Sequence, residues 1–371
     1  MATKTWNDGS DNWNTAADWS PTGVPGPGDD AVIPFGVVSL TTPVTVGSIS
    51  LTTSSATLGI VYPGIDAVTG EFSNSGTVGV DFGVSSGTTL TIGGMLTNTA
   101  SGSFNIGYSG ISFTADATVT AAALSNAGAI NLTGNASAQA TLNIAGAAPA
   151  IWTGRLSLQD SALLEFGSGG ITSIANGARL ELFGFNTQPR VAISGDTGTN
   201  SALAHLSINA GVLTLYQTVP LTTDPGTDFS NSGSAWVSGT TVALGGVLAN
   251  SGAFTVGDNF NSATTFSAAG FSNTGAFIVT VNPSAFSPFP ASATFSGSAP
   301  STITGRIRLF GNAAMQFTGG GTINSIASGA SLELDTWRGS QPLLTGLSGL
   351  TSNAGTLNLD STPPVAAGTE A

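Results

Sequence analysis

The sequence predicts an all-β chain in which short strands stack as the coils of a β-solenoid. Three observations lead to this expectation: a short turn motif recurs along the chain, two long segments are near copies of each other, and charged residues are scarce. Only 7% of the 371 residues are charged, although 40% are hydrophobic. Ordinary soluble domains carry roughly 25% charged residues, and helical bundles need them to cover their outer faces. The composition therefore disfavours a helical fold.

The recurring motif consists of Asn, a small residue, Gly and then apolar residues at alternate positions. Its copies begin at Asn74, Asn126, Asn209, Asn231, Asn250, Asn273 and Asn353, and Asn98 begins a variant with two extra residues. Most neighbouring copies are 19 to 28 residues apart. Alternation with a period of two is typical of a strand with one buried face, and a repeat of roughly 20 to 25 residues is typical of one solenoid coil. We therefore expect about 14 to 15 coils of a right-handed, single-stranded parallel β-helix.

The residue types of the motif predict its local structure. We expect its glycines to form corners with positive φ, because glycine has no Cβ. Asparagine tolerates the left-handed region and hydrogen-bonds to nearby backbone, so we expect it in the same turns. Gly-Gly pairs such as Gly93-Gly94 are expected to be turns as well. Asparagines at one point of successive coils are also expected to stack as a side-chain amide ladder, as in cross-β structures.

The sequence also contains a longer duplication that includes several of the short repeats. Residues 153–182 reappear as residues 304–334 with an offset of 151 to 152 residues. A solenoid lengthens readily in this way, because each repeat contacts only its neighbours. The predicted organisation is an N-terminal cap at 1–40, a first multi-coil block at 41–228, a duplicated second block at 229–362 and a tail or linker at 363–371.

The first forty residues differ from the repeats and contain Trp6, Trp13 and Trp19. A solenoid needs a terminal unit that shields its open end, so we expect a Trp-rich cap here. Residues 6–33, with the pattern W…NW…W…G.P…D.V.I, resemble the N-terminal segment of large bacterial surface and secreted proteins. Many of these continue into autotransporter-passenger or filamentous-haemagglutinin-like β-helical repeats. The resemblance implies an extracellular β-solenoid at a bacterial cell surface.

Parallel β-helices also occur in polysaccharide-degrading enzymes, so the acidic residues need examination. A glycoside hydrolase needs two carboxylates that converge on one bond. The one adjacent acidic pair, Asp29-Asp30, precedes a predicted strand, and a structural turn is favoured there over a catalytic or cation-binding role. Arg155 and Arg306 are duplicated between the two blocks, as are Glu181 and Glu333, and all four occupy outward strand positions. Their duplication favours repeat architecture over a single active site.

Three further features are weighed in the same way. His205 is the single histidine, and we interpret it as a surface or turn residue. Asp224 to Asp228 could hold a calcium ion, but an exposed turn is favoured. The insertion Pro283 to Pro290, with Phe286 and Phe289, is expected to pack over a coil rather than to bind a ligand. We predict no catalytic residue, no cofactor site and no metal site, and leave calcium open.

Charge and composition exclude other classes of function. The net charge is −13 with no cluster of Lys or Arg, so binding to nucleic acid lacks an electrostatic basis. No apolar run reaches the roughly 18 residues of a transmembrane helix. The chain has no cysteine, which excludes disulfides and thiolate metal sites. No Sec signal peptide is visible at the N-terminus.

These observations together favour a non-catalytic extracellular structural or adhesive protein, a β-helical component of a bacterial surface adhesin or matrix fibre. Its expected partners are further copies of itself, joined end to end, or surface glycans and host surfaces. The alternatives are a pectin-lyase-like enzyme that degrades polysaccharide and a carbohydrate-binding module. The enzymatic alternative rests on analogy of fold alone. The binding alternative would need ladders of Thr or Ser, and threonines such as Thr88 and Thr240 do not recur from coil to coil.

Overall fold

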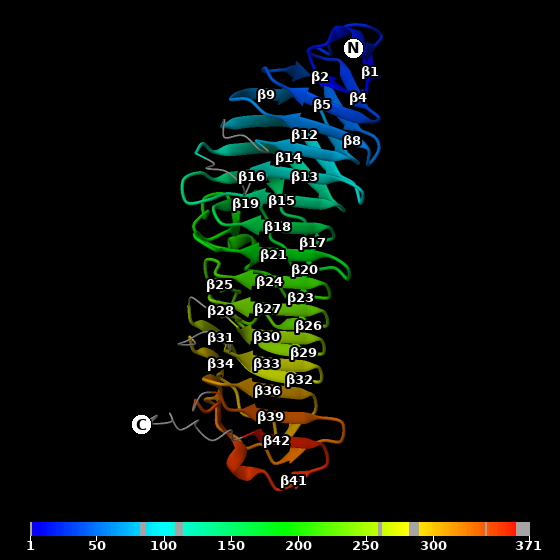
Figure 1. Ribbon diagram of the computed structural model, residues 1–371. Coiled ribbons are helices and arrows are strands. Elements are labelled where there is room, and N and C mark those ends of the chain that lie inside the picture. Colours follow the sequence, from blue (N-terminus) through cyan, green and yellow to red (C-terminus); the bar gives the residue numbers. More distant parts are fainter. Residues whose placement is uncertain are drawn as a thin grey trace, which may run out of the picture. The chain divides into compact units, whose positions relative to one another are not determined.

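The computed structural model describes residues 2–81, 87–107, 114–258, 262–281, 289–337 and 340–360. The chain is all-β, and its parallel strands stack as a β-solenoid of about 14 turns, which confirms the predicted fold class (Figure 1). The handedness of the coils and the role of the first forty residues as a cap stay predictions. Residues 1–203 and 204–371 form two compact units. Phe286 and the predicted tail at 363–371 lie outside the described residues.

In the first unit, two long sheets carry most of the strands. One sheet contains β1 (Thr3–Trp6), β3 (Trp19–Ser20), β4 (Asp30–Ile33), β6 (Thr45–Val46), β7 (Ser48–Leu51), β9 (Gly64–Val68), β10 (Phe72–Asn74), β12 (Thr88–Asn98), β14 (Ala117–Asn126), β16 (Ala140–Ala147), β19 (Ala162–Ser168) and β22 (Arg190–Ile193). The facing strands are β2 (Ser10–Asn12), β5 (Gly36–Leu40), β8 (Ala56–Ile60), β11 (Thr77–Val80), β13 (Ser103–Gly107), β15 (Ala129–Thr133), β18 (Arg155–Gln159) and β21 (Arg179–Phe183). β17 (Ile151–Trp152) and β20 (Ser173–Ile174) pair with each other and belong to neither of these two sheets. The unit also contains two 3₁₀ turns, η1 (Ala16–Asp18) and η2 (Ser201–Leu203).

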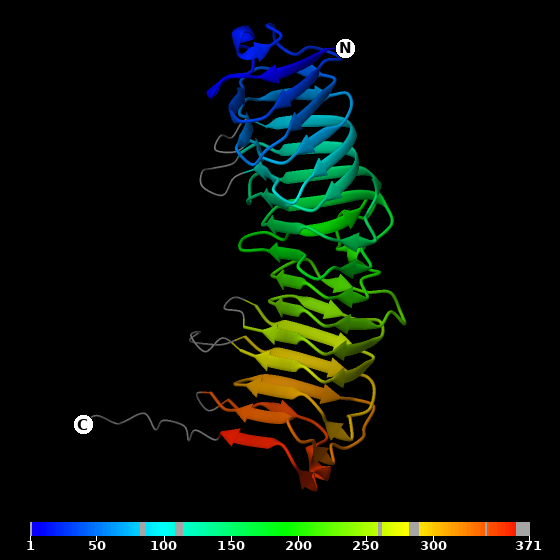
Figure 2. The same ribbon diagram turned by 90° about the vertical axis from the view of Figure 1, so that its right-hand side faces the viewer.

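In the second unit, most coils consist of three strands, one for each of three faces (Figure 2). The first face contains β23 (Ile208–Asn209), β26 (Phe229–Asn231), β29 (Val247–Asn250) and β32 (Gly270–Asn273), followed by β35 (Thr302–Ile303), β38 (Ser325–Ile326) and β41 (Ser352–Asn353). The second contains β24 (Val212–Tyr216), β27 (Ser234–Ser238), β30 (Ala253–Gly257), β33 (Ala276–Thr280), β36 (Arg306–Phe310), β39 (Ser331–Asp335) and β42 (Thr356–Asp360). The third contains β25 (Leu221–Thr222), β28 (Thr241–Ala243), β31 (Thr264–Ala268), β34 (Ala291–Phe295), β37 (Ala313–Phe317) and β40 (Leu343–Leu344), and η3 (Leu347–Gly349) precedes the last coil.

The core consists of apolar columns that run from coil to coil. In the first unit, Val38, Leu58, Val78, Phe104, Ile130, Leu156 and Leu180 follow one another in register and are all fully buried. The second unit has a matching column of Leu213, Ala235, Phe254, Phe277, Ile307 and Leu332, in which the rings of Phe254 and Phe277 stack with centroids 5.7 Å apart. Burial of one such large side chain contributes about 1.5–3 kcal/mol relative to exposure. The alternating pattern of the sequence therefore supplies the driving force for stacking.

The glycines of the motif have a different role from the one predicted. Gly76, Gly233, Gly252 and Gly275 do not have positive φ, and the motif asparagines do not either. A Cβ on Gly252 would instead lie 2.1 Å from the carbonyl oxygen of Gly233 in the preceding coil. The prediction of left-handed corners was wrong here, because close approach between coils, rather than backbone conformation, excludes a side chain.

Positive φ occurs at other corners, directly after β11, β18, β30 and β36. Asp81, Asp160 and Asp258 have φ of 55°, 54° and 68° there, and Gly311 has 67°. The Gly-Gly prediction also needs correction, since Gly93 and Gly94 lie inside β12. The register between β12 and β14 shifts at this point, so the strand bends around a corner without ending.

The three predicted cap tryptophans form one buried cluster. Trp6, Trp13 and Trp19 are at most 1% exposed. The ring of Trp19 meets those of Trp6 and Trp13 edge to face, with centroids 5.2 and 4.8 Å apart. Its indole N–H donates to the carbonyl of Trp13 at 2.8 Å. β3 pairs antiparallel with β1, in contrast to the parallel pairing of the coils. No helix in the described part of the chain is long and apolar enough to span a membrane.

Substitution of Gly252 by Ala tests the close-approach explanation. The added Cβ would overlap the carbonyl of Gly233, so we expect destabilisation of about 1–3 kcal/mol, seen as a lower midpoint of thermal unfolding by circular dichroism. Gly198→Ala is the matched control, since nothing lies within 4 Å of its Cβ position and its φ is not positive. There the loss of chain entropy in the unfolded state makes Ala neutral or slightly stabilising. Equal effects at both sites would contradict the explanation.

Candidate functional site

The motif asparagines lie at equivalent positions of successive coils and bond to each other. In the second unit, Asn209 donates from Nδ2 to Oδ1 of Asn231, Asn231 to Asn250 and Asn250 to Asn273, each at 2.7 Å. In the first unit, Asn74 donates to Asn98 and Asn98 to Asn126 at 2.8 Å. Ladder members also donate to a backbone carbonyl of the next coil, as Asn231 does to Ala253 at 3.0 Å. All seven are at most 9% exposed, and the ladder satisfies most of their buried amide groups; Oδ1 of Asn209, at the first position of its ladder, has no partner among the described residues.

Both ladders stop at a threonine. After Asn126 the next coil has Thr153, and after Asn273 it has Thr304, at matching points of the two duplicated segments. Each threonine hydroxyl donates at 2.7 Å to the backbone carbonyl of the asparagine before it. The eighth motif asparagine, Asn353, is exposed, and its Oδ1 accepts from the backbone N–H of Gly355 at 3.0 Å. Asn353 is therefore separate from the two buried ladders.

A hollow opens where each ladder ends. One of about 210 Å³ is lined by Asn126, Pro149, Trp152 and Thr153 among others. Its counterpart of about 120 Å³ includes Asn273 and Pro300. Pockets for small molecules usually have volumes of about 300–1,000 Å³. A larger, shallow groove of about 400 Å³ follows the bend of β12, β14 and β16, and Gly93, Thr120, Ala121, Ala122, Asn143 and Ala145 contribute uncharged groups to its lining.

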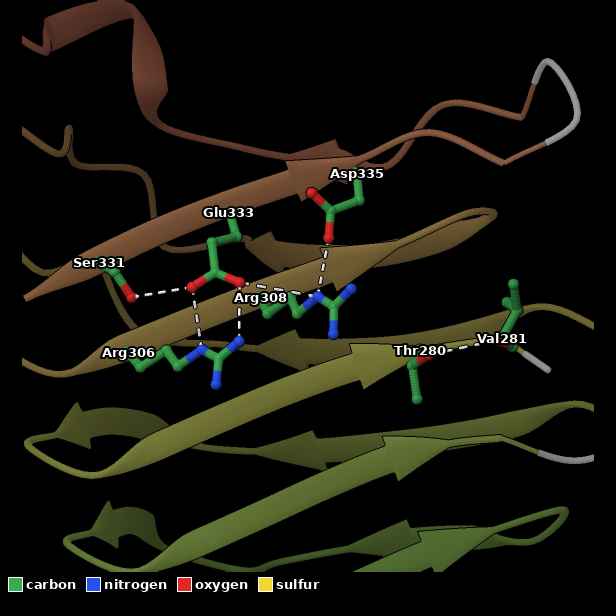
Figure 3. A network of polar contacts seen from close by, with 7 residues as sticks. All are labelled: Thr280, Val281, Arg306, Arg308, Ser331, Glu333 and Asp335. Atoms are coloured by element: carbon green, nitrogen blue, oxygen red, sulfur yellow. Dashed lines mark hydrogen bonds and ion pairs between the residues drawn. The ribbon is translucent and has the colours of Figure 1, made fainter. Parts of the chain in front are cut away.

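The strongest charged cluster lies on the outer face of β36 and β39, and Figure 3 shows its side chains. Glu333 accepts from Arg306 in a two-pronged arrangement, with Nε to Oε1 at 3.0 Å and Nη2 to Oε2 at 2.8 Å. Arg308 binds Asp335 at 2.7 Å, and its guanidinium lies 5.5 Å from the ring centre of Phe310. The hydrogen bond from Arg306 lowers the pKa of Glu333 below its usual 4.5. These charges are engaged with the neighbouring coil.

The first unit contains the duplicated counterpart on β18 and β21. Arg155 and Arg179 approach the carboxylate of Glu181 at 3.2 and 3.4 Å. Glu181 is only 7% exposed, although its strand position faces outward. The structure thus brings together the duplicated charges that the sequence singled out, in each unit as cation–carboxylate contacts between successive coils.

Asp29 and Asp30 serve a turn. Asp29 accepts from the backbone N–H groups of Gly26 at 3.2 Å and Ala2 at 3.0 Å, and these hydrogen bonds lower its pKa. Asp30 accepts from the hydroxyl of Ser48 at 2.7 Å. The two carboxylates therefore hold adjacent strands at the start of the chain, which agrees with the structural role favoured from the sequence.

His205 is exposed, and its Nδ1 lies 2.5 Å from Oδ2 of Asp224. Asp228, at the other end of the same turn, accepts from the backbone N–H of Val247 at 2.7 Å. The two carboxylates proposed as possible calcium ligands thus already contact protein groups. His205 and Asp224 together stabilise a surface turn.

An acidic cluster that the sequence had not indicated lies near the N-terminus. Carboxylate oxygens of Asp8, Asp11 and Asp18 lie within 4.8 Å of one another, which is close enough to share a metal ion. Burial, together with the charges of the other two, raises the pKa of Asp18. The antiparallel pairing of β1 with β3 brings Asp18 back beside Asp8. The only sequence signal was three aspartates within eleven residues.

Two buried carboxylates were also missed. Asp66 is 1% exposed; it accepts from the hydroxyl of Tyr62 and from the backbone N–H of Val44, and burial raises its pKa. Asp160 is 5% exposed and accepts from the backbone N–H groups of residues 185–187 in the next coil. Buried carboxylates need such donors because an unpaired charge is costly away from water. Asp160 therefore joins two coils at a corner.

Replacement of Asn231 by Asp tests the ladder. The new carboxylate would face two acceptors, Oδ1 of Asn250 and the carbonyl of Ala253, with no water to solvate it. We expect destabilisation of about 3 kcal/mol or more, measured as a lower denaturant midpoint at pH 7 and partly restored at acid pH. Asn353→Asp is the matched control, since this residue is exposed and keeps its bond from Gly355; we expect a change within about 0.5 kcal/mol. A tolerated Asp at position 231 would contradict the ladder.

The charged cluster predicts a pH-dependent contribution to stability. Arg306 lowers the pKa of Glu333 in the folded chain below the usual value of 4.5. The ion pair therefore stabilises the folded chain fully at pH values above 4.5. This stabilisation is lost as the pH falls through the lowered pKa of the folded chain. Glu333→Gln should therefore lower stability by about 0.5–1 kcal/mol at pH 7, an effect that disappears in strong acid. Glu71→Gln, at an exposed carboxylate with no ion pair among the described residues, serves as control. A pH-independent difference would argue against the ion pair.

No family model, curated protein or solved structure matches the chain. The all-β solenoid of about 14 turns therefore stands on the structure itself. The resemblance of residues 6–33 to bacterial surface proteins rests on the sequence pattern alone. The asparagine ladders, the Arg155–Glu181 and Arg306–Glu333 contacts and the bonds of Asp160 share one role, since each joins one coil to the next.

Proposed function

We propose that the chain is a non-catalytic extracellular protein with a structural or adhesive role, a β-helical component of a bacterial surface adhesin or matrix fibre. The observation that supports this most is the use of its polar side chains. Asparagine ladders, arginine–carboxylate pairs and the Asp160 corner all bond successive coils to each other. Groups engaged in this way resist separation of the coils, which suits a protein that bears load or persists outside a cell.

The charged side chains of the chain are not placed as polysaccharide cleavage by hydrolysis requires. A polysaccharide hydrolase needs an acid and a second carboxylate on opposite sides of the scissile bond. The groove of about 400 Å³ has uncharged lining residues, and the arginine–carboxylate clusters lie on the other long sheet. The shallow groove suits weak contact with an extended polymer better than bond cleavage. The proposed adhesion targets are therefore surface glycans and host surfaces, and other copies of the chain are the second proposed partner.

An activity screen combined with an adhesion assay tests this function. Purified chain is incubated with acidic and neutral polysaccharides, with and without calcium, while reducing ends and unsaturated products are measured. In parallel, non-adherent bacteria that display the chain are washed over glycan-coated and abiotic surfaces, with cells that display only the carrier as control. We expect retention on a surface without turnover. Turnover that carboxylate substitutions abolish would replace this proposal with the enzymatic alternative.

A further inference from the structure

One outward face of the first unit carries a regular array of hydroxyl groups. Strands β12, β14 and β16 pair there in parallel and in register, so outward side chains of successive coils lie side by side. Neighbouring coils are about 4.8 Å apart, and successive outward positions along one strand are about 6.5–7 Å apart. None of the residues in the array is buried, and they form two rows: Thr89, Thr118 and Thr141 in one, and Thr91, Thr120 and Asn143 in the other.

The second unit repeats this array on its third face. Figure 1 shows β28, β31 and β34 one above another, and their pairing is also in register. The duplicated sequence aligns Thr141 and Asn143 with Ser292 and Thr294, so residue types change while hydrogen-bonding groups are kept. The two rows of this unit consist of Thr241, Thr265 and Ser292, and of Ala243, Ser267 and Thr294. We call the two arrays together the hydroxyl rows.

The sequence had not indicated the hydroxyl rows. Thr88 and Thr240 are buried, and they lie outside the rows. Their neighbours Thr89 and Thr241 face outward, and their positions do recur as Thr or Ser on the next two coils. Loops of unequal length separate the paired strands, so the rows have no fixed period along the chain.

The hydroxyl rows are an exception to the use of polar groups between coils. On the other long sheet of the first unit, Asn131 donates to Asn105 at 2.9 Å, as the ladder asparagines do to one another. In the rows, Thr141 donates to the nearby Gln139 at 3.2 Å. Within the described part of the chain, the other nine hydroxyls of the rows take part in no hydrogen bond. Their donors and acceptors are therefore available to a ligand outside the chain.

The chemistry of the rows fits an uncharged ligand with many hydroxyl groups. A hydroxyl both donates and accepts, and the methyl group of threonine provides apolar contact beside it. The rows contain no charged residue, and the net charge of −13 disfavours acidic polymers. In the first unit, Thr120 and Asn143 also line the groove of about 400 Å³, which offers an elongated ligand a concave surface. A polymer with a regular repeat can contact equivalent groups on successive coils.

We propose that the hydroxyl rows of each unit bind an uncharged polysaccharide whose chain runs from coil to coil across the strands. This inference rests on the proposed function, for which it names the adhesion target. Sugar hydroxyls exchange hydrogen bonds with threonine and serine hydroxyls, and threonine methyl groups contact the C–H faces of the sugar rings. Single contacts of this kind are weak, so the affinity comes from their repetition on successive coils.

Removal of four central hydroxyls tests the site in the full chain. The fourfold variant carries Thr118→Val and Thr120→Val in the first unit, and Thr265→Val and Ser267→Ala in the second. Valine has nearly the shape of threonine and suits an outward strand position, so we expect an unchanged midpoint of thermal unfolding. Binding isotherms are measured by depletion of the chain onto insoluble cellulose, chitin and mannan, with cross-linked polygalacturonate as the acidic polymer.

We expect the unmodified chain to bind at least one neutral polysaccharide equally well at low salt and in about 1 M NaCl, where the Debye length is about 3 Å. The fourfold variant should bind about tenfold more weakly, because each lost hydrogen bond contributes modestly, and each pair alone should give part of this loss. Thr57→Val with Thr77→Val is the matched control and should bind normally. These outward threonines also pair in register, on β8 and β11, but beside glycines rather than a second row.

No binding to any neutral polysaccharide, an equal loss in the control, or binding to polygalacturonate alone overturns the proposal. Inhibition of ice recrystallisation without polysaccharide binding also overturns it and would assign the rows to ordered water. Reducing ends and unsaturated products are measured in the same samples. Turnover together with binding that depends on the four hydroxyls would support the site and contradict the non-catalytic function. Adhesion of displaying bacteria that persists in the fourfold variant, without polysaccharide binding, would do the reverse.

Discussion

The residue-for-residue register between successive coils is the constraint on which the rest of the structure depends. Strands of the second face pair in parallel without offset, as from Ala253–Ala276 to Gly257–Thr280. Each side chain therefore meets the side chain at the same position one coil away. Apolar positions become continuous columns, and a buried polar position is stable only if its neighbour can bond to it. Asparagine suits such a position, because its amide carries both a donor and an acceptor and can bond to a copy of itself.

The same constraint explains why charge is scarce and where it is found. A column of identical carboxylates at the spacing of about 4.8 Å between strands would repel itself. Charges occur instead where one coil supplies arginine and the next supplies glutamate, as at Arg306 and Glu333. The duplicated segment repeats this arrangement at Arg155 and Glu181. Arg155 lies directly opposite Arg179 of the next coil, and the carboxylate of Glu181 contacts both guanidinium groups.

The sequence was sufficient to predict the fold class, the approximate number of coils and seven of the eight asparagine positions as stacked, because these depend on periodicity along the chain; Asn353 lies outside both ladders. It was misleading about the motif glycines, since the contact that excludes a Cβ at Gly252 comes from the preceding coil. The same limit applies to polar groups joined across coils or by the antiparallel start of the chain. Asp160 bonds to residues 25 to 27 positions ahead, and Asp18 lies beside Asp8 only after β3 has paired with β1.

The repeated interruption of the ladders has an evolutionary consequence. Thr153 and Thr304 end the two amide ladders with the same bond, 151 residues apart, so the ancestral copying event carried a complete set of coils together with its interruption. An insertion of a fractional coil would have placed leucine beside serine along every face, with a cost at each boundary. A chain of this kind can therefore gain or lose whole coils, and so change its length, without redesign of the interior.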